Sequence, residues 1–450
     1  MHIVIIGNGI SGITAARYIR KLSNHNITVI SAETKYFYSR TALMYIYMGH
    51  MTYQNTKPYE DWFWEKNRIA LLQEYVTDVD TKHRKIRLQN GTNIEYDKLI
   101  LATGSASNKF GWKGQDLPQV QGLYNMQDLV KMEKNTNNIQ HAVVVGGGLI
   151  GIEMVEMLQS RRIPTTLLVR EKSFWDIVLP PEESQIINRQ IRKHHVDLQL
   201  ETELNEILAD ENGDVRAVTT KDGKEIPCQF VGLTVGVHPN IGFLKDSGIE
   251  TQKGILVDEY FQTNVEDVYA IGDCAQLRNP PAGRRPIEAV WYIGRIQGKT
   301  VAHTICGQKV PYQPRIWFNS AKFMDIEYQT YGTVLNSLQE DEAQLYWEHS
   351  DGEKCIKIVY EKASEKVVGF NLMGIRFRHD VCEEWLHEGR DLQYVLQHLR
   401  AANFDPEIYD QHENGIIEVY NQQFPNRRIE VKSKKSLWNM IFKRKVLVQN

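Results

Sequence analysis

The sequence predicts an α/β protein with two three-layer units and a smaller C-terminal α+β domain. An apolar run leads into three spaced glycines twice, at Met1 to Gly12 (MHIVIIGNGISG) and again at Gln140 to Gly151 (QHAVVVGGGLIG). From about Val310 the pattern changes to aromatic-rich strands followed by two amphipathic segments. Strands that alternate with helices predict parallel sheets, whereas grouped strands followed by helices predict an α+β arrangement.

The first glycine set has the spacing of a phosphate-binding turn. Gly7 would make the tight turn after the strand, Gly9 would let backbone approach a pyrophosphate, and Gly12 would let the helix Ile13 to Lys21 pack closely. The helix N-terminus would then hold the anion. A single match of this kind is weak, because glycine turns without a ligand are common.

The second set makes the signal specific. His141 aligns with His2, and Gly146, Gly148 and Gly151 align with the first three glycines. The helix Leu149 to Arg161 and the strand Thr165 to Val169 follow. Two copies in the same strand–turn–helix context predict two Rossmann-like dinucleotide-binding units.

Composition bounds the class of protein. The chain has 450 residues, 42% hydrophobic residues, 24% charged residues and a net charge of -3, which are values of an ordinary globular protein with no general reason to bind nucleic acid. No run approaches the ~18 apolar residues of a membrane span. The N-terminus enters a strand at once, so we expect an intracellular protein without a signal peptide. The five cysteines have no C-x-x-C pair and no metal-ligand spacing, so no metal site is expected.

Charged residues after the second strand of each unit are candidate nucleotide ligands. In the first unit Glu33 is displaced by a residue or two from the usual ribose-binding acid, and a solvated turn residue is the alternative. Arg40 could clamp a pyrophosphate, with a surface arginine as the alternative. In the second unit Glu171 favours NADH and Arg170 favours NADPH, so this pair alone leaves the choice open.

Three further elements complete the first unit. A hairpin is expected over Lys82 to Leu88 and Asn93 to Leu99, and the strand of Leu99 to Gly104 (LILATG) ends at Thr103 and Gly104. Tyr269 to Cys274 (YAIGDC) brings Asp273 to a strand end, where it could accept from a ribityl or ribose hydroxyl or act as a helix N-cap. The helix Glu288 to Cys306 carries Gly294 and Gly298, a spacing that predicts close packing.

The end of the chain is basic. Residues 427 to 445 contain eight Lys or Arg against one acid, Glu430, around an apolar cluster that includes Trp438 and Phe442. Such a segment suits an anionic membrane surface or an acidic partner, and a solvated, frayed tail is the alternative.

The ordered set GNGISG, LILATG, GGGLIG and YAIGDC resembles the pyridine nucleotide-dependent FAD reductases with two dinucleotide-binding domains. The resemblance implies that the first glycine set binds FAD, the second binds NAD(P)H, Thr103 and Gly104 link the two, and Asp273 holds the flavin ribityl chain. We include Trp291 among the cofactor-binding candidates. The expected domains are 1–113 with 250–312 for FAD, 114–249 for NAD(P)H, 313–425 as an α+β interface domain and 426–450 as a basic amphipathic tail.

Within this family the chain is most similar to the branch of rubredoxin reductases, dioxygenase ferredoxin reductases, apoptosis-inducing factor and the nitrite reductase flavin domain. The Y-x-R-P-x-L element of that branch reads Tyr38-Ser39-Arg40-Thr41-Ala42-Leu43, which supports Arg40 as an FAD ligand. Glu171 matches the ribose-binding glutamate, so NADH is preferred and NADPH is the alternative. Glu153 matches the glutamate beside the flavin; a glutamate favoured by the helix dipole is the structural alternative.

The departures from the family pattern indicate how electrons leave. Thr41 stands where related oxidases and disulfide reductases have a catalytic cysteine, and it cannot form a sulfenate or a disulfide. Tyr45 replaces the lysine that pairs with the flavin-side glutamate, and W-F-W-S becomes Trp317-Phe318-Asn319-Ser320.

We therefore hypothesise that hydride passes from NADH to FAD and electrons pass to a ferredoxin-like or rubredoxin-like protein, with Glu153 and Tyr45 as catalytic candidates. The alternatives are a peripheral membrane NADH:quinone reductase and an NADH-responsive interaction module. The expected location is the cytoplasm, with the inner face of a membrane as the alternative, and a homodimer is left open.

Overall fold

The computed structural model describes residues 1–430 and divides into two compact units, Met1–Arg315 and the unit that begins at Ile316. Within the described residues, no helix is both long and apolar enough to cross a membrane. The predicted apolar and basic segment at 432–445 lies outside the described residues. Near the end of the described residues, Ile429 is buried, and its N–H and its carbonyl both bond the Asn421 side chain.

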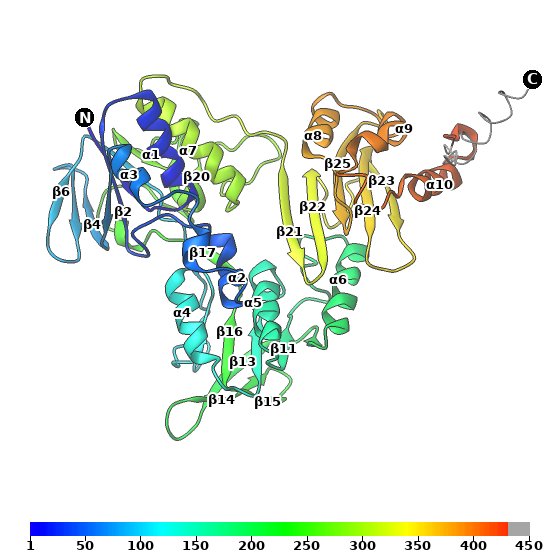
Figure 1. Cartoon of the computed structure of the whole chain (residues 1–450), viewed down its shortest axis with the longest axis horizontal. Coiled ribbons are helices and arrows are strands. Elements are labelled where there is room, and N and C mark those ends of the chain that lie inside the picture. The colour runs from blue at the N-terminus through cyan, green and yellow to red at the C-terminus, as the bar shows by residue number, and fades with distance from the viewer. Residues whose placement is uncertain (431–450) are drawn as a thin grey trace, which may run out of the picture. The chain divides into compact units, whose positions relative to one another are not determined.

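The first unit contains a five-stranded parallel sheet in the order β19-β7-β1-β2-β3, of which Figure 1 labels β2. Its strands are β1 (His2–Ile6), β2 (Asn26–Ser31), β3 (Ile69–Gln73), β7 (Lys98–Leu101) and β19 (Val268–Ala270). Helix α1 (Ile10–Leu22) lies beside α7 (Trp291–Ile305). A Cβ on Gly298 would lie 2.4 Å from the Ser11 carbonyl oxygen, which confirms the close packing predicted for this helix.

Smaller pieces surround this sheet. The predicted hairpin is present as β5 (Lys85–Leu88) and β6 (Asn93–Glu95), to which β4 (Val76–Asp80) adds a third antiparallel strand. The segment expected to run from Asn93 to Leu99 is interrupted, because Lys98 onward pairs with β1 instead. The remaining elements are α2 (Leu43–Tyr47), α3 (Trp62–Lys66), β8 (Ser105–Ser107), β17 (Val237–Pro239), β18 (Ile255–Val257) and β20 (Ala275–Leu277).

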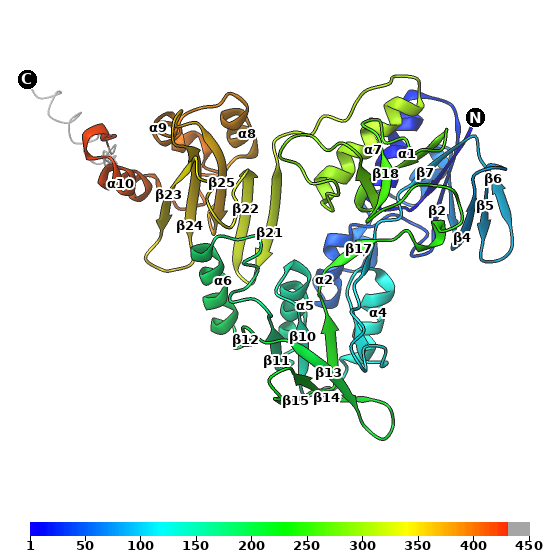
Figure 2. The same ribbon diagram turned by 180° about the vertical axis from the view of Figure 1, so that it is seen from behind.

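A second parallel sheet repeats the first, in the order β12-β11-β10-β16-β9 (Figure 2). Its strands are β9 (Val120–Gln121), β10 (Ala142–Val145), β11 (Thr165–Leu168), β12 (Asp197–Gln199) and β16 (Phe230–Leu233). The helices are α4 (Met126–Asn135), α5 (Leu149–Ser160) and α6 (Pro181–Lys193), and an antiparallel sheet of β13 (Leu204–Ala209), β14 (Val215–Thr220) and β15 (Glu225–Pro227) adds a cover.

The repeat extends to a side-chain contact. His2 Nε2 lies 2.9 Å from Thr28 Oγ1 in the first sheet, and His141 Nε2 lies 3.0 Å from Thr166 Oγ1 in the second. The same residue types therefore join the first two strands of both sheets, as expected for a duplicated unit.

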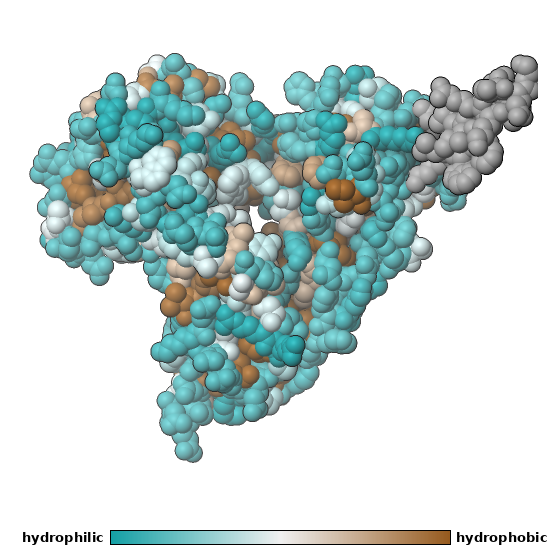
Figure 3. Space-filling model, in the orientation of Figure 1, coloured by the Kyte–Doolittle hydropathy of each residue, from teal (hydrophilic) through white to brown (hydrophobic). Residues whose placement is uncertain are grey.

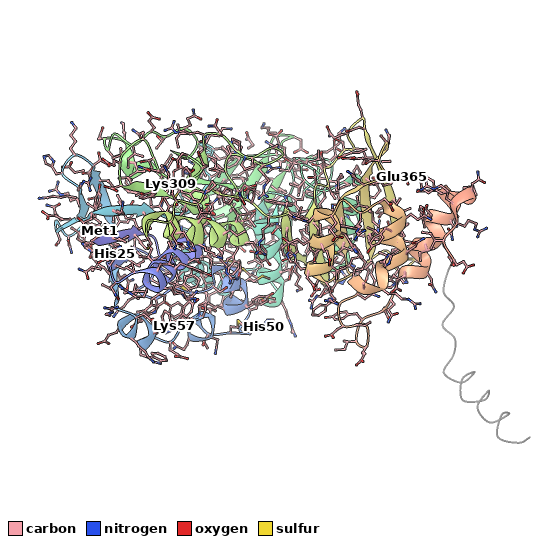
Figure 4. All side chains as sticks on the ribbon, turned by 90° about the horizontal axis from the view of Figure 1, so that it is seen from above. Met1, His25, His50, Lys57, Lys309 and Glu365 are labelled. Carbon is pink, nitrogen blue, oxygen red and sulfur yellow. The ribbon has the colours of Figure 1, made fainter. Side chains whose placement is uncertain are left out.

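The described part of the unit that begins at Ile316 contains an antiparallel sheet in the order β21-β22-β25-β24-β23 and the α-helices α8, α9 and α10. Its elements are β21 (Phe318–Phe323), β22 (Ile326–Gly332), β23 (Glu342–Glu348), β24 (Cys355–Glu361), β25 (Val367–Met373), α8 (His379–His387), α9 (Leu392–Ala402) and α10 (Glu413–Gln423). Glu365, labelled in Figure 4, pairs with Arg427 after the last helix (2.6 Å, Nη2 to Oε2). Two parallel α/β sheets followed by this domain confirm the predicted fold class.

Candidate dinucleotide site

A cavity of about 730 Å³ opens at the carboxyl end of the first parallel sheet. Parallel sheets of this kind bind ligands at that end. The cavity is lined by the first glycine turn, by the ends of β2 and β3, by the Thr-Gly and Gly-Asp turns and by the start of α5; these contributions include Gly7, Gly9, Glu33, Arg40, Glu74, Thr103, Gly104, Glu153 and Asp273. The face drawn in Figure 3 is mostly hydrophilic, with small apolar areas.

The first glycine turn has the geometry of an anion site. Gly7 has φ +112°, and a Cβ there would lie 2.0 Å from the Ala102 carbonyl oxygen, so only glycine fits this turn. A Cβ on Gly9 would meet nothing within 4 Å, and Gly9 caps α1 without a side-chain hydrogen bond. The space beside Gly9 is therefore open, and the first N–H groups of a helix have no partner within the helix, which suits a pyrophosphate.

Glu33 and Arg40 form an ion pair on the cavity wall. Arg40 Nη2 lies 2.6 Å from Glu33 Oε2, and Nη1 donates to the Tyr124 carbonyl (2.6 Å). Glu33 also accepts from the Tyr38 hydroxyl and from the backbone N–H of Met126 (2.9 Å). Burial alone would lower the pKa of Arg40, but the Glu33 carboxylate raises it, so the guanidinium stays charged.

Asp273 follows β19, at the other edge of the same sheet, and has two hydroxyl donors. Its carboxylate is 3.1 Å from Ser105 Oγ and 3.3 Å from the Tyr124 hydroxyl. Burial raises the pKa of Asp273, while these hydrogen bonds favour the ionised form. Thr103 donates to the Asn240 carbonyl (2.8 Å) and Gly104 has φ +66°. The Thr-Gly and Gly-Asp turns predicted from sequence therefore meet in one place.

Tyr124 is a lining residue that sequence reasoning missed. Its hydroxyl accepts from the Ser105 N–H (2.8 Å), and its ring lies 4.6 Å from the Arg40 guanidinium. The nearest sequence signal is the Asn125 capping box with Asp128, which marks the start of α4 directly after Tyr124. That signal locates a helix but gives no indication of a ligand.

Helix α5 brings the second dinucleotide unit to the same cavity. Leu149, Ile150 and Glu153 of its first turns line the wall. Burial, and then the nearby Glu156 carboxylate, raise the pKa of Glu153 to about 7. A carboxyl group with this pKa exchanges protons near neutral pH.

The second glycine turn repeats the first but lies outside the lining of this cavity. Gly146 has φ +123°, and a Cβ there would lie 2.4 Å from the Thr234 carbonyl oxygen. A Cβ on Gly148 would meet nothing within 4 Å, and one on Gly151 would lie 2.2 Å from the Gly146 carbonyl oxygen. Arg170 donates from Nε (3.0 Å) and from Nη2 (2.7 Å) to the same Glu171 oxygen.

Some of the remaining candidate residues line the cavity and others do not. Trp291, at the start of α7, and Thr41 line the cavity. Tyr45 is not among the lining residues, and its ring stacks on His50, labelled in Figure 4, with 6.2 Å between centroids. Asn319 belongs to the other compact unit.

The donor set fits a flavin dinucleotide. Residues 1–430 contain no group of three or more His, Cys, Asp or Glu that could hold a metal ion. The five cysteines are free, and four of them are buried. An uncapped helix N-terminus at one end and an acid held by hydroxyl groups at the other match a pyrophosphate and a polyol.

Comparison with known proteins agrees with this geometry. Residues 1–301 match the model of the family described as pyridine nucleotide-disulphide oxidoreductase. The chain is 28% identical over 381 residues to a nitrite reductase [NAD(P)H] of Bacillus subtilis, which covers 83% of this chain but only 45% of that protein. It is 31% identical over 337 residues to the ferredoxin reductase subunit of a 5,5'-dehydrodivanillate O-demethylase of Sphingobium, covering 74% of this chain and 81% of that one.

Among solved structures, an NAD-dependent persulfide reductase from A. fulgidus superposes with a TM-score of 0.81 at 22% identity, covering 97% of this chain and 89% of that one. This likeness concerns the fold. The match over residues 1–301, the duplicated glycine turns and the shared cavity place the chain in the pyridine nucleotide-disulphide oxidoreductase family.

Proposed function

We propose that the chain is an FAD-dependent NADH oxidoreductase that passes electrons to an external redox protein. The observation that carries this proposal is the cavity itself. Its wall combines the first glycine turn with the start of α5, which belongs to the second dinucleotide-binding sheet. A nucleotide on the second turn would reach this wall along α5. Bound FAD supplies hydride acceptance from a nicotinamide and release of electrons to an acceptor.

The first unit holds FAD through backbone and charge. The α1 N-terminus beyond Gly7, Gly9 and Gly12 binds the pyrophosphate, and Asp273 accepts from the ribityl chain. Arg40 assists at the pyrophosphate, since its hydrogen bonds to residues 1–430 use only Nη1 and Nη2 and leave the Nε edge for an oxyanion. Thr103, Gly104 and Trp291 complete the wall.

The second dinucleotide-binding sheet and its glycine turn hold the nicotinamide nucleotide. Gly146, Gly148 and Gly151 form the pyrophosphate turn, and Glu171 accepts from the adenosine ribose of NADH. Arg170 is 71% exposed and paired with Glu171, so it is not held toward an extra phosphate. Glu153 holds or releases a proton at the cavity wall. Tyr45 does not line the cavity, so we propose that it acts only indirectly, through the residues that it contacts.

The absence of a cysteine at position 41 favours an external acceptor. Thr41 lines the cavity, where a cysteine could otherwise take electrons as a disulfide. The relative from Sphingobium is a ferredoxin reductase subunit, and we carry that acceptor class to this chain. A quinone at a membrane is the second candidate, which rests on the basic residues of 427–445.

Anaerobic titration of the purified full chain tests the proposal. We expect bound FAD to bleach with NADH at lower concentration than with NADPH, and a ferredoxin or rubredoxin to restore the oxidised spectrum over many turnovers. A flavin that neither nucleotide bleaches would contradict the proposal.

Experiments on the same purified chain distinguish the candidate electron acceptors and test for membrane binding. Faster turnover with a soluble quinone than with any redox protein, together with binding to anionic vesicles, would favour the membrane reductase. Truncation after Glu430 keeps the buried Ile429 and removes most of the basic residues. If the truncated chain still binds vesicles, the tail is not the anchor. Lack of multiple turnover with any acceptor would favour an interaction module.

A further inference from the structure

The Glu33 carboxylate is occupied by protein donors. It receives four hydrogen bonds, from the Tyr38 hydroxyl, the Met126 N–H, Arg40 Nη1 and Arg40 Nη2. A carboxylate has about four lone-pair positions in total. Accepting a ribose diol as well would require Glu33 to give up bonds that it already makes.

The main chain of Glu33 is tied to the same helix. Its carbonyl accepts from the Gln127 side chain (2.9 Å), next to the Met126 N–H at the first position of α4. A carboxylate at a helix N-terminus is stabilised there by the helix dipole. Glu33 therefore joins Arg40 to α4 and is not directed at a ligand.

The neighbouring strand β3 places another acid, Glu74, beside the end of β2. Strands β2 and β3 pair in parallel with Ser31 opposite Gln73, and the Glu74 N–H donates to the Ser31 carbonyl (3.1 Å). Continuing the pairing by one residue sets Glu74 beside Ala32. Partners in a parallel pair present side chains to the same face, and both residues line the cavity.

The Glu74 side chain is available for a ligand. It is half-buried, and none of the hydrogen bonds or ion pairs found among residues 1–430 involves its carboxylate. Arg40, the cation among the residues that line the cavity, is paired with Glu33. Tyr75 follows at the same rim of the cavity and is 48% exposed.

We propose that Glu74, at the end of β3, is the acid that accepts the adenosine-ribose hydroxyls of FAD, and that Glu33 is a positioning residue for Arg40 and α4. The proposal rests on FAD binding in this cavity. A dinucleotide site usually takes this carboxylate from the end of the second strand, where Ala32 and Glu33 stand here. Two hydroxyl donors on one carboxylate are charge-assisted hydrogen bonds, which are stronger than neutral ones.

Binding of FAD and of an FAD analogue whose adenosine ribose lacks both hydroxyls tests this assignment. The dissociation constants are measured by flavin fluorescence on the full chain after removal of bound flavin. We expect the unmodified chain to prefer FAD by about tenfold or more, and Glu74→Gln to lose most of that preference. Glu33→Gln should keep the preference while the protein unfolds at a lower temperature. Glu60→Gln, exposed and outside the cavity lining, is the matched control.

The outcomes are separable. If Glu74→Gln keeps the full preference, or if Glu33→Gln loses it while still folded, the assignment is overturned. If the unmodified chain binds neither flavin, the proposed function itself fails. A Glu74→Asp variant with partial preference would support a direct contact, because the shorter side chain keeps the charge but not the reach.

Discussion

The Tyr124 hydroxyl lies 3.3 Å from the Asp273 carboxylate and 2.8 Å from the Ser105 nitrogen. Burial raises the pKa of Tyr124 to about 12, so the phenol keeps its proton and donates to Asp273. A Cβ on Gly104 would lie 2.7 Å from the same oxygen. One phenol therefore joins the Thr-Gly turn to the acid that we assign to the ribityl chain.

Replacing Tyr124 with phenylalanine should weaken the contact between the Thr-Gly turn and Asp273 but keep the aromatic ring in the cavity wall. The ring would still cover Arg40, but the Ser105 N–H would lose its acceptor and Asp273 one donor. We expect about 1 kcal/mol lower free energy of unfolding and several-fold weaker FAD binding, measured by urea unfolding and flavin fluorescence. Tyr409→Phe, exposed on the other compact unit, controls for loss of a phenol. Equal FAD affinity in Tyr124→Phe would contradict the role.

Alanine at the glycines should separate binding from folding. A Cβ on Gly148 enters open space, so Gly148→Ala should fold, retain FAD and bind NADH at least about tenfold more weakly, because the methyl group occupies the pyrophosphate position. Gly151→Ala should fail to fold normally, since its Cβ would lie 2.2 Å from the Gly146 carbonyl oxygen. Circular dichroism and NADH titration check both, and unchanged NADH affinity in the folded Gly148→Ala would count against the site.

Local patterns were enough to predict the two sheets and the turns at their ends. The strand and glycine spacing at Gly7, Gly146 and Asp273 lies within a dozen residues each time, so the chain's own periodicity carries the information. Helices α4 and α6 were not predicted, although a capping box at Asn125 and a proline at the first position of α6 mark their starts. Those starts lack a long apolar repeat, so hydrophobic periodicity alone does not locate them.

Residues whose role depends on distant pairing could not be predicted. Glu74 becomes a neighbour of Ala32 only because β2 and β3 pair in one register, and Tyr124 meets Asp273 across 149 positions of sequence. Glu33 lies on the cavity wall, and its partner at Met126 is 93 residues away. Such contacts depend on tertiary packing, which spacing along one chain does not encode.

Glu153 should make stability depend on pH. Burial raises its pKa in the folded state from the ordinary 4.5 of a glutamate to about 7, so the folded state holds the proton more tightly than the unfolded state. The folded state therefore loses stability as the pH rises from about 4.5 through about 7, by roughly 3 kcal/mol. Glu153→Gln should remove this loss and become more stable than the unmodified flavin-free chain at about pH 8, but not at about pH 4.

Urea unfolding of both proteins across that pH range measures the effect. Glu60→Gln, an exposed glutamate, should follow the unmodified chain at every pH. Parallel curves for Glu153→Gln and the unmodified chain would show that Glu153 titrates normally.

The choice of nucleotide should depend on how Glu171 holds Arg170. Both Arg170 hydrogen bonds end on one Glu171 oxygen, and the arginine is otherwise exposed. Glu171→Gln removes the charge that pairs this arginine and weakens acceptance from the NADH ribose, so Arg170 becomes available to the extra phosphate of NADPH. We expect the ratio of kcat/KM for NADH over NADPH to fall about tenfold or more. Arg170→Ala should raise that ratio, because only the carboxylate remains. If both variants keep the ratio of the unmodified chain, other residues near the second glycine turn determine the nucleotide choice.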